Sequence, residues 1–279
     1  MNQVFFNIMI HLFYFIGTVF LIGFAIYNLN RLFYRIIGPH IWICYLTGII
    51  GTPVHELSHA LACLIFGHKI QEMRLFQIDR KSGLLGYVNH SYNKKNLYQV
   101  VGNYFIGVAP ILIGTLFLSL IMWWLLPTAF DEFSAYLQDF SYLQQNGFSW
   151  KWLAYAWSVF LGYIRIIFLS ISEGENWWIF MILALCISLH MNLSDLDIKG
   201  ALRALPFLTV SFALLHILLF FISRSIYESF VQVINVAGSY LTGILLLSLV
   251  LAFFSVILSV ICKGIISFIK PIKIDNGKL

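Results

Sequence analysis

The sequence predicts an all-α polytopic membrane protein with about six transmembrane helices and a small β-hairpin. Of its 279 residues, 60% are hydrophobic and only 10% are charged, which excludes an ordinary soluble domain. The apolar residues gather into runs long enough to cross a bilayer, which takes about 20 residues of helix. Because the net charge of +5 is modest, we expect the lipid bilayer as a partner and no nucleic acid.

Six apolar runs are predicted to cross the membrane. They lie at residues 4–27, 41–66, 100–126, 177–193, 205–222 and 238–262. A seventh run, 152–172, contains Arg165 and many aromatic residues, and it either crosses or lies in the interface. No long polar region separates these runs, so a single integral-membrane domain is expected over residues 1–279.

Charge placement predicts the orientation of this domain. The segment 67–99 carries six Lys and Arg residues against two acidic ones, and the tail after residue 262 is also basic, so both are expected in the cytoplasm. The acidic stretch 127–151 is expected on the opposite side. An even number of crossings must then separate the two basic segments, which holds if 152–172 does not cross.

The run 41–66 contains the pattern His55-Glu56-Leu57-Ser58-His59, an HExxH motif. On a helix, the two histidines lie one turn apart on the same face and can hold one zinc ion, with Glu56 beside them as a base. Chance places this motif in roughly 0.5% of chains of this composition. The alternative is a pair of satisfied core histidines, but ionisable groups inside a membrane segment usually mark a functional site.

The helix that carries the motif is expected to restart just before it. Gly48 and Gly51 interrupt the apolar run, Thr52 can cap a helix, and Pro53 suits a first helical position.

A β-hairpin is expected after the motif helix. Segments 69–78 and 84–90 mix apolar and polar residues in imperfect alternation, and they flank a polar turn at 79–83. The alternative is a solvated loop.

A catalytic zinc ion takes a third protein ligand, and the candidates lie at the end of the run 177–193. Asp197 is favoured because Ser194, Asp197 and Gly200 would share one helical face, whereas Asp195 could cap the following helix. His190 is a weaker candidate.

The four cysteines show no CxxC spacing and are predicted to be buried free thiols; they are Cys44, Cys63, Cys186 and Cys262.

Three patterns together resemble the site-2 protease family of intramembrane zinc metalloproteases. They are HELSHA in a membrane helix, GVAPILIG at 107–114, and an aspartate near the end of a later helix, and the resemblance covers about residues 41–200. The segment Asp197-Ile198-Lys199-Gly200 departs from the Asp-Gly of the family, which indicates a divergent member. The resemblance implies a protease core over 41–200 and one zinc ion per chain, bound by His55, His59 and Asp197 (alternatively Asp195).

The expected function is hydrolysis of a peptide bond in or near the transmembrane segment of a membrane-anchored protein or peptide, at the cytoplasmic side of the cell membrane. Glu56 would be the general base, and Asn103 or Asn192 would either steady the oxyanion or serve packing. The predicted hairpin, at Ile70 and Leu75, would hold the unwound substrate by strand addition. The alternatives are an inactive zinc-binding scaffold or regulator of the same fold, and a transporter.

Overall fold

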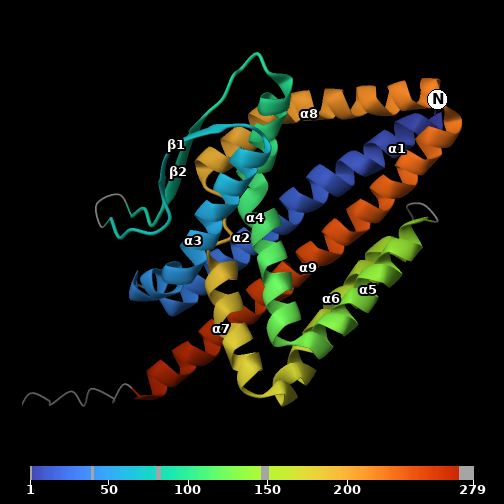
Figure 1. Ribbon diagram of the computed structural model, residues 1–279. Helices are drawn as coiled ribbons and strands as arrows, with labels where there is room; N and C mark the ends of the chain where they lie inside the picture. The colour runs from blue at the N-terminus through green and yellow to red at the C-terminus, as the bar shows by residue number, and fades with distance from the viewer. Residues whose placement is uncertain (1, 39–40, 80–82, 146–150, 270–279) are drawn as a thin grey trace, which may run out of the picture.

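The computed structural model describes residues 2–38, 41–79, 83–145 and 151–269, and most of this chain is helical (Figure 1). The helices are α1 (Asn2–Leu12), α2 (Thr18–Ile37), α3 (Ile41–Ile65), α4 (Leu97–Leu125), α5 (Pro127–Gln145), α6 (Lys151–Leu169), α7 (Glu175–Leu189), α8 (Asp195–Ile222) and α9 (Arg224–Ile269). A π-helical turn, η1 (Phe13–Gly17), joins α1 to α2, and a 3₁₀ turn, η2 (Ser170–Glu173), follows α6. The predicted all-α architecture is confirmed.

Five helices of the described residues are long and apolar enough to cross a membrane. They are Asn2–Ile37, Leu97–Leu125, Ala154–Glu173, Asp195–Ile222 and Arg224–Gly264. The set differs from the predicted one, because it includes the region of 152–172 and omits α3 and α7. Helix α3 carries the polar motif His55, Glu56 and His59 within it, and α7 has only 15 residues, short of a full crossing.

Residues 127–145, in the acidic stretch of the sequence, form the helix α5. Its apolar face repeats at Ala129, Phe133 and Leu137, which are all buried, and this face packs against α6 and α9. Helix α6 returns alongside α5, so the pair brings the chain back to the end of the bundle where α5 began (Figure 1). Of the two helices, only α6 is among the described helices long and apolar enough to cross a membrane. The number of crossings between the two basic segments therefore stays a prediction.

Helix α3 is continuous from Ile41 to Ile65, with Pro53 inside it, so the predicted restart before the motif is wrong. Gly51 has another role. A Cβ at this position would clash with the backbone oxygen of Cys186 and with the ring of His190, so the missing side chain lets α7 approach α3 closely. Close packing and a helix break both favour glycine in the sequence, and here the first applies.

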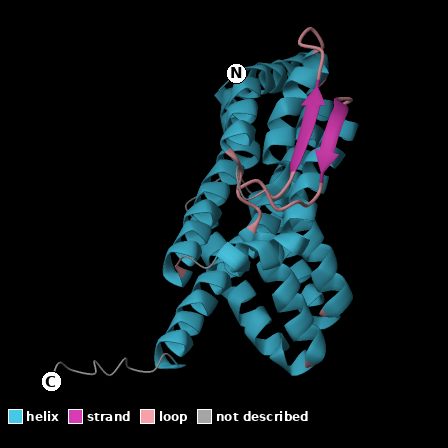
Figure 2. Cartoon of the chain, turned by 90° about the vertical axis from the view of Figure 1, so that its left-hand side faces the viewer, coloured by secondary structure: helices cyan, strands magenta, loops and turns pink. Residues whose placement is uncertain are grey.

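The predicted hairpin is present. Strands β1 (Lys69–Arg74) and β2 (Tyr87–Ser91) pair antiparallel, with Lys69 opposite Ser91 and an irregularity between Ile70 and Glu72 (Figure 2). The strands are shorter than expected, because β1 ends before Leu75, and the predicted turn at 79–83 lies partly outside the described residues. Ile70 and Val88 pack on a small cluster formed by Ala62 and Cys63 of α3 with Ile106 and Ala109 of α4.

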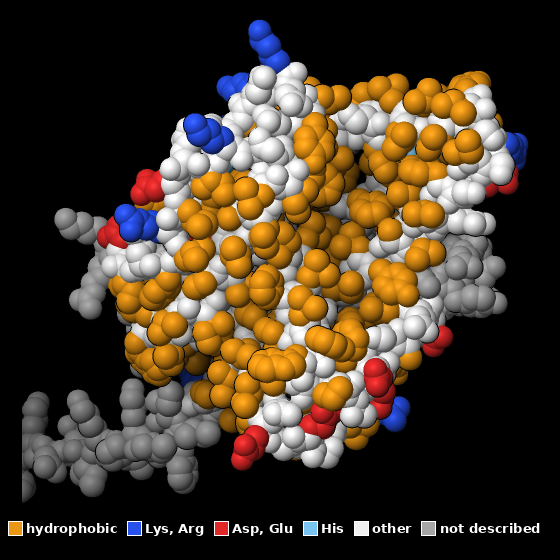
Figure 3. Space-filling view, in the orientation of Figure 1, with side chains coloured by type: hydrophobic (Ala, Val, Ile, Leu, Met, Phe, Trp, Pro, Cys, Tyr) orange, Lys and Arg blue, Asp and Glu red, His pale blue; other side chains and the backbone are white. Residues whose placement is uncertain are grey.

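The surface fits a lipid environment. Hydrophobic side chains cover the middle of the face shown in Figure 3, while Lys and Arg stand mainly near the hairpin and Asp and Glu mainly at the opposite end. Helix α8 contributes some of the most exposed apolar side chains, among them Phe221, which is 72% exposed. A chain with this surface requires an apolar solvent around it. The C-terminal residues 270–279, which carry most of the basic tail, lie outside the described residues.

Candidate metal centre

The two motif histidines face each other across one turn of α3. Their Nε2 atoms are 3.2 Å apart. Each ring is oriented from behind by a backbone oxygen, since Nδ1 of His55 donates to the carbonyl of His190 (2.7 Å) and Nδ1 of His59 donates to that of Ile106 (2.8 Å). Because carbonyl oxygens only accept, both Nδ1 atoms carry a proton, and the two Nε2 atoms are turned toward each other. A cation held between them, either a proton or a metal ion, would bind both rings.

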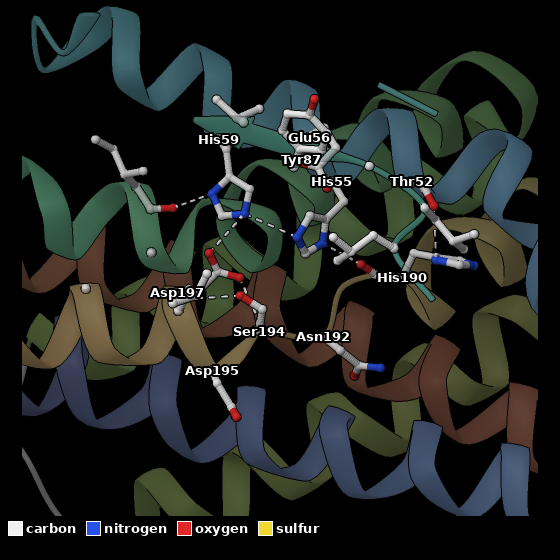
Figure 4. A pocket seen from close by; sticks show the side chains of 18 of the residues that line it. Thr52, His55, Glu56, His59, Tyr87, His190, Asn192, Ser194, Asp195 and Asp197 are labelled. Carbon is white, nitrogen blue, oxygen red and sulfur yellow. Dashed lines mark hydrogen bonds and ion pairs between the residues drawn. The ribbon is translucent and has the colours of Figure 1, made fainter. Parts of the chain in front are cut away.

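The third member of the cluster is Asp197, in the first turn of α8. Its Oδ1 lies 3.3 Å from Nε2 of His59, and Figure 4 shows the carboxylate directed at the histidine pair. One ligand atom from each of His55, His59 and Asp197 lies within 4.8 Å of the others. The predicted third ligand is therefore brought to the motif by the fold.

Local hydrogen bonds explain the position of Asp197. Ser194 caps α8 and accepts from the backbone N–H of Asp197 (3.2 Å), while Oδ2 of Asp197 accepts from the N–H of Ser194 (2.7 Å). This reciprocal capping box holds the carboxylate with one oxygen engaged and the other turned to His59. Asp195 is exposed and points away from the histidines (Figure 4), and Ser194 takes the capping role that the sequence left open for Asp195.

Gly107 in α4 allows α8 to begin this close to the motif helix. A Cβ on Gly107 would clash with the backbone oxygen of Asp197 and would lie 3.0 Å from Cβ of Ala201. The first glycine of the GVAPILIG segment therefore serves the close approach of α8 to α4. Helix α4 itself lies between α3 and α8 and contacts both.

His190 is a supporting residue rather than a member of the cluster. Its ring contacts the hydroxyls of Thr47 (3.0 Å) and Thr52 (3.4 Å) on α3, and its carbonyl orients His55. The backbone roles of His190 and Ile106 left no signal in the sequence, because any residue type offers a carbonyl.

The two asparagines considered for the oxyanion both line the cavity around the motif. The amide of Asn103 donates to the carbonyls of Gln99 and Val100 in its own helix, both at 3.2 Å. The amide of Asn192 accepts from Asn30 of α2 (3.0 Å) and points away from the histidines (Figure 4). Neither amide is directed at the cluster in this structure.

A cavity of about 1110 Å³ opens on the cluster. Glu56 lines it and is buried, and Gly86 lies so close that a Cβ there would be 2.7 Å from Cγ of Glu56. The hairpin contributes Gln71 and the segment 84–90 to the cavity wall, whereas Ile70 and Leu75 are not among the lining residues. The strand facing the site is therefore β2, which corrects the expected placement at Ile70 and Leu75.

Comparison with protein-family models, with curated proteins and with solved structures found no match. The site must therefore be understood from its own geometry.

The donor set suits a zinc ion. Two imidazoles and a carboxylate are a common ligand combination of catalytic zinc, which leaves a fourth position open for water. The hydrogen bonds that hold these side chains are also typical of metal sites. Each histidine donates its Nδ1–H to a backbone carbonyl, and the carboxylate accepts from a backbone N–H. Residues His55, His59 and Asp197 could thus hold a divalent metal beside a buried carboxylate and a cavity.

Proposed function

We propose that the chain is an intramembrane zinc metalloprotease of the site-2 protease type. The observation that carries this proposal is the convergence of His55, His59 and Asp197 on one point, next to Glu56 and an open cavity. His55, His59 and Glu56 come from one helix and Asp197 from another, far along the chain. A zinc ion bound by these residues would activate a water molecule and polarise a scissile carbonyl.

Each residue then has a chemical role. Glu56 accepts a proton from the attacking water and passes it to the leaving amine. The carbonyls of His190 and Ile106 fix the ring orientations of His55 and His59. The capping box keeps one oxygen of Asp197 on the histidine side.

The cavity supplies what proteolysis needs in an apolar surrounding. Its volume is large enough for water, and residues 87–90 of the strand β2 line its wall. A helical substrate hides its peptide groups, so it must unwind before attack. We infer that the unwound segment pairs with the edge of β2, where main-chain hydrogen bonds hold it in reach of Glu56.

The substrate class follows from the location. The chain has apolar helices long enough to cross a membrane, so a substrate anchored in the same bilayer meets the site by lateral diffusion. The basic hairpin segment favours a site near the cytoplasmic face.

The variant Glu56→Gln tests the proposal. Removal of the base should lower cleavage by roughly 10²–10⁴-fold, while the unchanged ligands should retain the metal. Glu228→Gln is the matched control, since Glu228 is exposed on α9 and pairs with Arg224. The measurement compares new protein N-termini in membranes of cells that produce each variant.

New termini within or beside transmembrane segments should be present with wild type and with Glu228→Gln, and lost with Glu56→Gln. An identical set of termini with Glu56→Gln would contradict proteolysis. Metal retention together with that result would indicate a zinc-binding scaffold instead.

A further inference from the structure

A second cluster of metal-ligating side chains lies at the far end of the motif helix. It consists of Cys63 of α3, His68 in the link to the hairpin, and His90 of β2. One ligand atom from each residue lies within 4.8 Å of the others. We propose that these three residues form a second zinc site, which fixes the hairpin to α3.

The end of α3 places His68 over Cys63. Gly67 adopts a left-handed conformation (φ 67°), its N–H donates to the carbonyl of Leu64 (3.2 Å), and the N–H of His68 donates to that of Cys63 (2.8 Å). These two bonds form a Schellman motif, in which the chain folds back over the last helical turn. The imidazole and the thiol are thus brought together by backbone geometry.

The ring of His68 is held in one tautomer. Its Nε2 donates to the carbonyl of Gln99 at the start of α4 (2.8 Å), and the Gln99 side chain donates to the carbonyl of Gly67 (2.7 Å). Tyr92 stacks on the ring, with centroids 5.0 Å apart and planes at 15°. The proton on Nε2 leaves the lone pair on Nδ1, and an outer contact of this kind is typical of histidine ligands.

Strand pairing brings the third residue. His90 lies opposite Ile70 in the hairpin, and its Nδ1 is 3.0 Å from Nδ1 of His68. Two nitrogen ligands of one tetrahedral zinc ion are about 3.3 Å apart, as follows from a Zn–N bond of about 2.0–2.1 Å. The two nitrogens therefore need little movement to share an ion.

The surroundings favour a structural role. Cys63 is fully buried (0% exposed) within a small apolar cluster, and a thiolate with two imidazoles suits zinc better than magnesium or calcium. Cys63 follows His59 by four residues, about one turn of α3, and the two clusters share no ligand. The second ion would act separately from the first, and this inference does not depend on proteolysis.

Cobalt substitution of the purified full-length protein tests the second site. The first cluster contains no sulfur, so a sulfur-to-cobalt charge-transfer band in the near ultraviolet reports on Cys63 alone. We expect this band in wild type and in His55→Ala, and its loss in Cys63→Ser. Cys262→Ser is the matched thiol control, because Cys262 lies in α9, outside both candidate clusters.

Metal analysis supplies a second measurement. Wild type should bind about two zinc ions per chain, and Cys63→Ser and His90→Asn about one each. His90 is only partly buried, so His90→Asn keeps the test usable if Cys63→Ser does not fold. Absence of the band in wild type, or its persistence in Cys63→Ser, would leave an ordinary hydrogen bond between His68 and His90 and overturn the proposal.

Discussion

At the scale of single residues, Asp197 combines two roles that are usually separate. One carboxylate oxygen completes the capping box of α8, and the other lies 3.3 Å from His59. The helix start therefore sets the geometry of the cluster, and any change at Asp197 affects both the helix and the site. A loss of the cap alone destabilises by about 0.5–2 kcal/mol.

Substitution of the two neighbouring aspartates separates these roles. Asp197→Ala should lower zinc affinity by more than the about 10–100-fold that follows loss of an outer contact, because it removes a ligand. Asp195→Ala should retain the metal, since Asp195 points away from the histidines. Equilibrium dialysis of the purified variants against a zinc buffer measures both.

Asp197→Asn serves as the control for folding, because its amide oxygen can still accept from Ser194. Loss of zinc from Asp195→Ala but not from Asp197→Ala would reverse the ligand assignment.

At the scale of elements, sequence reasoning succeeded where the signal was local. The four-residue spacing of His55 and His59 fixes them on one helix face with Glu56 beside them, and the hairpin follows from alternation around a polar turn. Asp197 was favoured because it would share a helical face with Ser194 and Gly200, and the family resemblance supported it.

The role of the glycines of α3 could not be predicted, because a helix break and a close contact require the same residue type. The cluster of Cys63, His68 and His90 had no pattern in the sequence, since strand pairing and a helix end bring its members together.

Helix α5 was not among the predicted elements. The acidic charge of this stretch indicates only its side of the membrane, although Ala129, Phe133 and Leu137 show the helical period. Only the packing against α6 and α9 shows that this narrow stripe suffices for a helix.

Proline variants of β2 test whether this strand holds the substrate. Successive N–H groups of a strand point to opposite edges, so of Val88 and Asn89 one donates toward β1 and the other toward the free edge. The proline variant that leaves the hairpin intact should reduce cleavage with no loss of zinc at the first site, because it removes a donor to the substrate. Circular dichroism, zinc content and cleavage are compared with Val88→Ala and Asn89→Ala. Full cleavage by both proline variants would exclude strand addition.

At the scale of the whole molecule, α4 sets the depth of the candidate site. From Leu97 to Leu125 this helix is about 42 Å long, more than the about 30 Å of a hydrocarbon core. Ile106, whose carbonyl orients His59, lies about 14 Å from its first residue. The cluster is therefore closer to the hairpin end of the bundle than to the end where α5 begins.

Thiol labelling tests this arrangement and its orientation. Lys94→Cys lies just before α4 and Asp131→Cys in the first turns of α5, at opposite ends of α4 (Figure 1). Because basic segments stay in the cytoplasm, a membrane-impermeant maleimide should label Lys94→Cys from the cytoplasmic side only and Asp131→Cys from the other side only. Right-side-out and inverted sealed vesicles give the two readings, and wild type, with its four native cysteines, supplies the background.

Labelling of both variants from one side would mean that α4 does not cross the membrane. Exchange of the two sides would keep the crossing but move the site toward the opposite face, where a cytoplasmic cleavage could not occur.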